Sequence, residues 1–387
     1  MEDVQLSKTI AAIMQLRLPG TVGKIASKMR YVDEIAPRLR EGGLIRAIPE
    51  LHLDRAHAVA ISTKSNSLPA FGGVLYGAAA LRQDIFVEQK QVVRSHQDSR
   101  VDISDMNFLD TAQRLTWHEY RLAYELLNDL FDQGPLPDLV LLDLPLLIVR
   151  GAQTSSLDDE DVSAGWAAVM DVMSRFWGRW LPRCYPSDPE GPFVVALGRR
   201  YFGAILNAVH AQGYTGSLEP LNEEVVGLVQ QEWMTLRQAG IMRVLSSLLR
   251  VGKRTAAYPY TALGKDVLRA APRSLGMHGL IGFHLQVGYR TPVWQVETIG
   301  PASAWDSAHL DHLAGLVAYL TLYDHPSVWP LPLWYAKRLV HMPQGVLRTY
   351  RSRTMELLRE GTIDQAWLEG IDTLADEGNF MPELDMG

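Results

Sequence analysis

The sequence has very little cysteine: Cys184 is the single one among 387 residues. One thiol cannot close a disulfide within the chain, and no histidine stands near it at the spacing of a zinc site. Small domains held together by disulfides or by structural zinc are therefore excluded. We expect a protein of a reducing compartment, the cytoplasm.

Long hydrophobic runs are also missing. The longest apolar stretch, 139–149, is interrupted by Asp143, and residues 1–30 contain no continuous apolar segment. A helix that crosses a membrane needs about 20 consecutive apolar residues, and a secretory signal needs an apolar centre. We therefore expect neither export nor membrane insertion.

Positive charge is not in excess, because the formal net charge is -7. Non-specific affinity for DNA comes mainly from neutralised phosphates, so any contact with nucleic acid must be local. Two groups of basic residues are candidates for such a contact. Lys253, Arg254 and Lys265 belong to the first group, and Lys337 and Arg338 belong to the second. Solvated helix faces are the alternative explanation for either group.

What the chain does contain is 47% hydrophobic residues, enough for one large core or two smaller ones, and no internal repeat. We divide it into a helical segment at 1–50, a core at 51–345 and a helix-rich, acidic tail at 346–387. The core includes a largely helical insertion at about 158–250. A chain of this composition is expected to be folded over most of its length.

The order of the predicted elements indicates an α/β fold. Three consecutive antiparallel strands are expected at 56–63, 72–81 and 85–93. A helix at 117–131, with apolar residues at spacings of three and four, then leads into a buried strand at 138–149. A helix that feeds a central strand is typical of α/β sheets.

Fewer signals mark the remaining segments. Residues 1–50 are predicted to form two or three helices, and a short strand is predicted at 193–197 inside the helical insertion. Two strands within 279–299 are followed by helices at 306–323 and 332–341.

Two carboxylates are expected to lie level with each other. The helix from Glu119 to Phe131 rises about 18 Å, and the strand from Asp138 to Asp143 returns about 17 Å. Paired carboxylates at the end of a strand suit Mg²⁺ or Mn²⁺, whose bound waters can attack a phosphodiester. We therefore predict a metal-dependent nuclease centre at Glu119 and Asp143.

Each carboxylate also has a purely structural explanation. Thr116 and Glu119 fit a capping box, in which the glutamate binds the first amide of the helix. Asp143 stands in an apolar run, where a carboxylate is costly to bury unless it is paired, hydrogen-bonded or bound to metal. A nucleotide-binding loop at Gly20–Lys24 is rejected, because its glycine spacing is too short and no Ser or Thr follows the lysine.

Three short motifs resemble those of the NurA nucleases, over roughly residues 50–345. Residues 139–146 are similar to the family's apolar strand that ends in Asp-Gly-Ser-Leu, with the aspartate at Asp143. Residues 282–297 resemble a late hairpin that ends in Arg-Val-Glu, and 329–337 resemble a closing Tyr-Pro-x-x-Leu-x-x-Ala-His motif.

The sequence departs from the family at functional positions. The family carries an aspartate after its first strand, whereas this chain reads Val59-Ala60-Ile61-Ser62-Thr63, without a carboxylate. Gln295 stands where arginine is usual, and Lys337 stands where histidine is usual. A hydroxyl does not supply the missing negative charge, and an ammonium group is only a donor, not a metal ligand near pH 7.

The resemblance implies a ribonuclease-H-like mixed sheet core with flanking helices and a helical insertion. It also implies a homodimeric nuclease that processes DNA ends, for example in repair, together with a HerA-like hexameric ATPase that translocates DNA. Glu119 and Asp143 would bind Mn²⁺ or Mg²⁺, and Lys337 would complete the catalytic set. The expected DNA-binding residues are Lys253, Arg254, Lys265, Tyr289, Lys337 and Arg338.

Two alternatives stay open. In the first, the altered ligands make the chain a weakened or inactive adaptor on the same motor. In the second, the motif resemblance is accidental, and the chain is an α/β protein that binds a small ligand or another protein.

Overall fold

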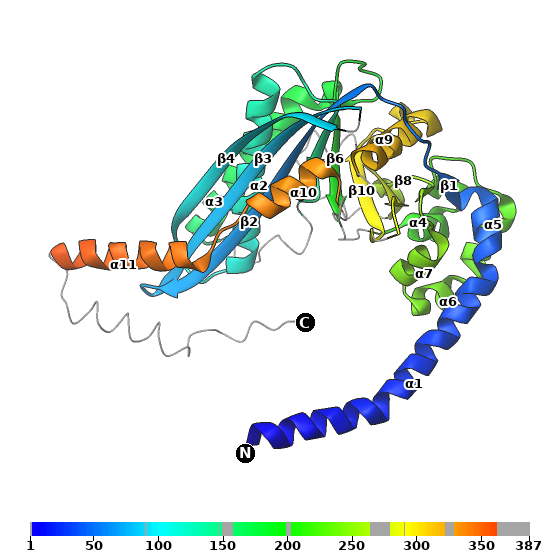
Figure 1. The fold of residues 1–387 in the computed structure, drawn as a ribbon, viewed down its shortest axis with the longest axis horizontal. Helices are drawn as coiled ribbons and strands as arrows, with labels where there is room; N and C mark the ends of the chain where they lie inside the picture. Colours follow the sequence, from blue (N-terminus) through cyan, green and yellow to red (C-terminus); the bar gives the residue numbers. More distant parts are fainter. Residues whose placement is uncertain are drawn as a thin grey trace.

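The computed structural model describes residues 2–89, 91–146, 148, 158–198, 203–263, 279–289, 291–321 and 329–361. Its centre is a ten-stranded mixed sheet (Figure 1). The strand order is β1-β7-β9-β10-β6-β5-β2-β3-β4, and β8 pairs with β9. Among the described residues, no helix is both long and apolar enough to span a bilayer.

The first three long strands form an antiparallel meander. β2 (Arg55–Ala70), β3 (Gly73–Glu88) and β4 (Gln91–Met106) have 16 residues each. The sequence predicted this order but placed the third strand at 85–93, where residues 85–88 still belong to β3. The error has a physical cause: β4 is an edge strand and mostly exposed, so it lacks the apolar alternation that marks a strand.

The central strands run parallel to β2. After α2 (Thr111–Asp132), β5 (Leu139–Leu142) pairs with β2, and β6 (Phe193–Gly198) pairs with β5. A meander, a helix and two added parallel strands make the ribonuclease-H-like α/β core that the sequence predicted. The predicted strand at 138–149 was too long, because β5 ends at Leu142, one residue before Asp143.

The other half of the sheet is antiparallel. β9 (Leu280–Gln286) and β10 (Trp294–Ile299) form the predicted late hairpin, and β10 pairs with β6. Three short strands had no signal in the sequence, because two or three residues are too few to show a pattern. They are β1 (Ile45–Ala47), β7 (Lys253–Thr255) and β8 (Tyr258–Pro259).

Helices cover the sheet. Between β5 and β7 the described residues include α3 (Glu160–Trp180), α4 (Ile205–Gln212), α5 (Glu223–Gln231), α6 (Trp233–Ala239) and α7 (Ile241–Leu248). Later helices are α9 (Ser307–Leu320), α10 (Leu331–Leu339) and α11 (Gln344–Glu360). The prediction of two or three N-terminal helices was wrong: α1 (Glu2–Leu39) is one helix that continues through Pro19.

The two faces of the sheet carry separate cores, and this separation decides the geometry of the site. Val59 and Ile61 of β2 lie on the face that packs against α2 and α3. Ala58 and Ala60 lie on the opposite face, which packs against α9 and α10. Successive side chains of a strand point to opposite faces, so the odd and even residues of β2 can be assigned throughout.

Candidate functional site

Asp143 lies directly after β5, the strand that pairs with β2 on one side and with β6 on the other. Its backbone N–H donates to the carbonyl of Ile61 at 3.0 Å, which extends the parallel pairing by one residue. Asp143 is therefore level with Ser62, and the Ser62 hydroxyl donates to its Oδ2 at 2.7 Å. Both side chains belong to the face covered by α9 and α10.

Lys337 reaches Asp143 from α10, which contacts β2, β3 and β5 (Figure 1). Its ammonium group forms an ion pair and a hydrogen bond with Asp143 Oδ1. The ammonium also lies over the ring of Trp329, 4.6 Å from the centroid, and that ring stacks on Trp294 at 5.5 Å. The lysine is thus oriented by one carboxylate and one aromatic face.

Glu119 contacts the same stretch of β2 from the other face. Its Oε2 accepts from Thr63 Oγ1 at 3.2 Å, and its Oε1 accepts from Ser65 Oγ at 2.6 Å. Thr63 and Ser65 are odd-numbered residues, so they face α2. The predicted level of Glu119 along the strand is found, but Asp143 is on the opposite face.

The capping-box explanation of Glu119 is also wrong. α2 begins at Thr111, and its N-cap is Asp110, so Glu119 lies in the interior of the helix. Thr116 Oγ1 donates instead to the carbonyl of Ala112 at 3.0 Å, within the helix.

The donors around Asp143 do not fit a two-metal centre. One carboxylate oxygen is bound by an ammonium group and the other by a hydroxyl, while both oxygens of Glu119 accept from hydroxyls. Within the described ranges, no three His, Cys, Asp or Glu side chains gather as metal ligands. A divalent cation at Asp143 would have to displace Lys337 or tolerate a like charge beside it.

A residue to which the sequence assigned no role supports the segment after Asp143. Glu297 is 5% exposed; its Oε2 accepts from the backbone N–H of Leu146 at 3.1 Å, and its Oε1 accepts from Tyr260 at 2.5 Å. Burial raises the pKa of this carboxyl above its ordinary value. Gln295 donates to the Tyr260 hydroxyl at 2.8 Å, which extends the network.

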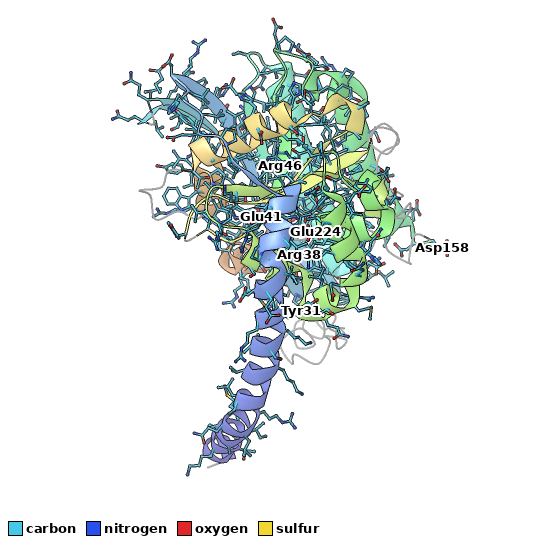
Figure 2. All side chains as sticks on the ribbon, turned by 90° about the vertical axis from the view of Figure 1, so that its right-hand side faces the viewer. Tyr31, Arg38, Glu41, Arg46, Asp158 and Glu224 are labelled. Atoms are coloured by element: carbon cyan, nitrogen blue, oxygen red, sulfur yellow. The ribbon has the colours of Figure 1, made fainter. Side chains whose placement is uncertain are left out.

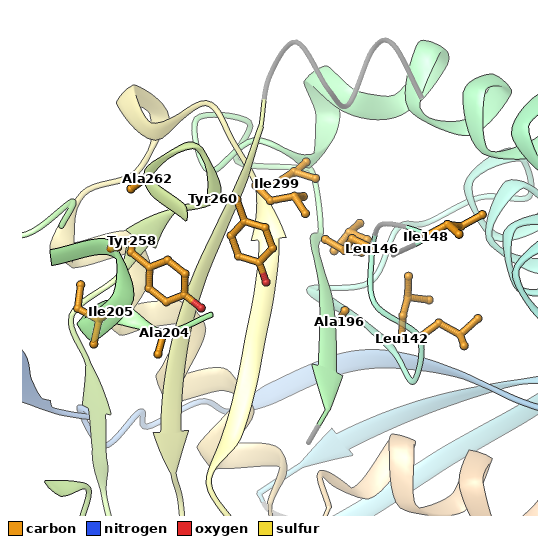
Figure 3. Close-up of a cluster of buried hydrophobic side chains, with 14 of the residues drawn as sticks. Leu142, Leu146, Ile148, Ala196, Ala204, Ile205, Tyr258, Tyr260, Ala262 and Ile299 are labelled. Atoms are coloured by element: carbon orange, nitrogen blue, oxygen red, sulfur yellow. The ribbon is translucent and has the colours of Figure 1, made fainter. Parts of the chain in front are cut away.

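Figure 3 shows this region, with Tyr258 and Tyr260 in the same buried cluster as Leu142 and Leu146. The sequence does contain a signal for this role, because Glu297 is a single carboxylate within the largely apolar strand 294–299. We infer that Glu297 positions the turn that follows β5.

The predicted DNA-binding residues are dispersed. Arg338 is exposed on α10 and lies over the ring of Trp334, 5.3 Å from the centroid. Tyr289 is 94% exposed in the turn between β9 and β10. Lys265 lies outside the described residues. Among the predicted residues that the structure describes, only Lys337 and Arg338 lie on α10, the helix that contributes the partner of Asp143.

The remaining two basic residues lie on β7, which β9, β10 and β6 separate from β5. Arg254 is 0% exposed, and its guanidinium binds Glu219 and Asp311. A phosphate cannot reach this side chain, so the prediction that Arg254 contacts DNA is wrong. Lys253 is partly exposed, far from Asp143 in the strand order.

The fold has counterparts among solved structures, although no protein-family profile and no curated protein sequence matches the chain. The NurA nuclease from Sulfolobus solfataricus aligns with 92% of this chain and 98% of its own, at 12% identity and a TM-score of 0.57. A NurA bound to dAMP and manganese covers 92% and 98% at 10% identity, with a TM-score of 0.45.

Endonuclease V from Bacillus subtilis covers 83% and 92% at 13% identity, with a TM-score of 0.31. The first of these three structures, with a TM-score above 0.5, shares its fold with this chain. This likeness agrees with the resemblance of the sequence motifs. The chain therefore has the fold of the NurA nuclease from Sulfolobus solfataricus.

Proposed function

We propose that the chain is a NurA-like DNA-processing subunit of a HerA-type hexameric translocase, and that it acts there as an adaptor that binds DNA without hydrolysing it. The observation that carries this proposal is the ion pair between Lys337 and Asp143. An ammonium group neutralises the carboxylate that would otherwise bind a cation. The sequence motifs favoured a nuclease first; the geometry favours the adaptor.

Lys337 is suited to hold a DNA phosphate. An ammonium group has three donors, so the hydrogen bond to Asp143 leaves two for another acceptor. The side chain is 28% exposed, and Arg338 follows it on the exposed side of α10. Both residues would contact the sugar-phosphate backbone, which gives affinity without sequence preference.

The alternative is a metal-dependent nuclease in which Mn²⁺ or Mg²⁺ displaces Lys337. Asp143 and Glu119 contact one four-residue stretch of β2, 62–65, and this proximity along the strand favours the alternative. The two proposals differ in what Asp143 does: the adaptor uses it to orient a lysine, and the nuclease uses it to bind metal.

Cleavage assays with the full chain separate the two. Purified protein, with and without the motor, is incubated with Mn²⁺ or Mg²⁺ and linear DNA, beside an Asp143→Ala variant. The adaptor predicts equal background cleavage for both proteins. Cleavage by the wild-type chain that Asp143→Ala abolishes would establish the nuclease instead.

A gain-of-function variant tests the reason for inactivity. Ser62 and Lys337 are the two partners of Asp143. The double variant Ser62→Asp with Lys337→His replaces them with a second carboxylate and a neutral imidazole. We expect Mn²⁺ binding by calorimetry to become at least roughly tenfold tighter than in the wild-type chain. The single variant Lys337→Met is the matched control, since it removes the ammonium group without adding a ligand.

A further inference from the structure

The N-terminal part of α1 projects from the body of the protein. The C-terminal part is anchored: Val32, Ala36 and Leu39 are buried, and α1 contacts α5, α6 and α7. Arg38 forms an ion pair with Glu224 at 2.7 Å. Figure 2 shows that the helix leaves the body near Tyr31 and continues away from it.

The projecting part carries an apolar stripe that continues the buried one. Ile10, Met14, Leu18, Val22 and Ile25 follow one another at spacings of three and four, and each is between 38% and 59% exposed. The same spacing continues to the buried residues of the anchored part, so both belong to one face of the helix. A contiguous exposed apolar face of this kind marks an interaction surface.

The charge of this segment limits what can bind the stripe. Between Ser7 and Arg30 the helix has no acidic residue. Its basic residues are Lys8, Arg17, Lys24, Lys28 and Arg30. Pairing with the α1 helix of a second copy would bring like charges together, which opposes association. The expected partner is acidic and apolar.

Residues 362–387 of the chain have this complementary character. They contain no Lys, Arg or His. Their acidic residues are Asp364, Glu369, Asp372, Asp376, Glu377, Glu383 and Asp385. Ile363, Trp367, Ile371 and Leu374 recur at spacings of four, four and three, which is the pattern of an amphipathic helix.

We propose that the apolar stripe of α1 binds residues 362–387 of a second copy of the chain. The second copy is the source because α11 ends at one side of the body while α1 leaves from the other (Figure 1). The pairing is reciprocal, so it produces a closed two-fold dimer with two equivalent contacts. This contact explains the expected dimer without requiring the DNA site.

Charge reversal tests the contact in the full chain. Arg17→Glu with Lys24→Glu is expected to raise the dimer dissociation constant roughly tenfold or more, measured by analytical ultracentrifugation. Glu369→Lys with Asp372→Lys should do the same, and the four changes combined should restore the dimer. Lack of restoration would overturn the pairing. Lys64→Glu with Arg348→Glu, the same charge change elsewhere, is the control that should leave the dimer intact.

Cross-linking tests the source of the segment. A chain with Val22→Cys and Ile371→Cys is treated with a short bis-maleimide; Cys184 is buried. A covalent dimer, formed by the double variant but not by either single variant, supports the proposal. A link within one chain, a dimer from Val22→Cys alone, or no link would each overturn it. None of these outcomes depends on DNA, so the proposed function is tested separately.

Discussion

Two charged clusters on the same sheet have opposite properties. On β7, Arg254 is 0% exposed, binds Glu219 through two hydrogen bonds of 2.7 Å, and binds Asp311 through a third of 2.8 Å. After β5, Lys337 and Asp143 form a single pair whose side chains are 28% and 15% exposed. Arg254 and Glu219 are closed to solvent, and only Asp311 at the edge of the first cluster is exposed, at 38%, whereas both members of the second pair are accessible.

The difference separates a structural charge from one that can bind a ligand. Burial alone would raise the pKa of Glu219, but the hydrogen bonds and charge of Arg254 outweigh it, and the pKa is lowered. Such a network has no donor to spare for DNA. Lys337 keeps donors available and lies where solvent reaches it, so it can exchange one acceptor for another.

The largest expected effect comes from breaking the buried cluster. Arg254→Ala leaves Glu219 without its main partner in the core, which costs about 3–5 kcal/mol of unfolding free energy. Urea unfolding followed by circular dichroism measures this loss. Lys253→Ala, the neighbouring residue on β7, should stay within about 0.5 kcal/mol. A loss below 1 kcal/mol for Arg254→Ala would contradict the structural role.

The fold was largely predictable because apolar periodicity records burial. The Trp117-to-Phe131 pattern and the run after Asp138 marked α2 and β5, and the motif after Gly282 marked the late hairpin. Strands with little burial or few residues left no such record, which is why β4 was misplaced and β1, β7 and β8 were missed.

The site was only partly predictable, since sequence gives distance along an element more readily than direction. The rise of α2 placed Glu119 level with Asp143, but the face on which each side chain lies depends on the register between β2 and β5. Likewise, the sequence does not distinguish the buried Arg254 from the accessible Lys337, because each belongs to a group of basic residues. Their partners, Glu219 and Asp143, lie 35 and 194 residues away along the chain.

A second prediction concerns the pH dependence conferred by Glu297, beside the Asp143 site. Because burial raises its pKa, its protonated form stabilises the fold at low pH. That contribution is complete below the unfolded value of about 4.3 and is lost as the pH rises through the folded value. Glu297→Gln removes the titration.

The measurement is urea unfolding of both proteins across a pH series. The stability of the wild-type chain relative to Glu297→Gln should fall as the pH rises above about 4.3, by at most about 1.4 kcal/mol per pH unit. Other titrating groups are common to both proteins and cancel in the difference. A difference independent of pH would show that folding does not change the pKa of Glu297.

The smallest effect on stability, and the most specific effect on binding, is expected at Lys337. Lys337→Ala removes a partly exposed ion pair and should cost about 1 kcal/mol or less. If the ammonium group binds a phosphate, log Kd plotted against log salt for a DNA duplex should lose about one unit of slope. Lys253→Ala deletes the same charge on β7, which three strands separate from β5, and should leave the slope unchanged. Equal slopes for Lys337→Ala and the wild-type chain would show that Lys337 binds no phosphate, and that its ion pair with Asp143 is structural, like the Arg254 cluster.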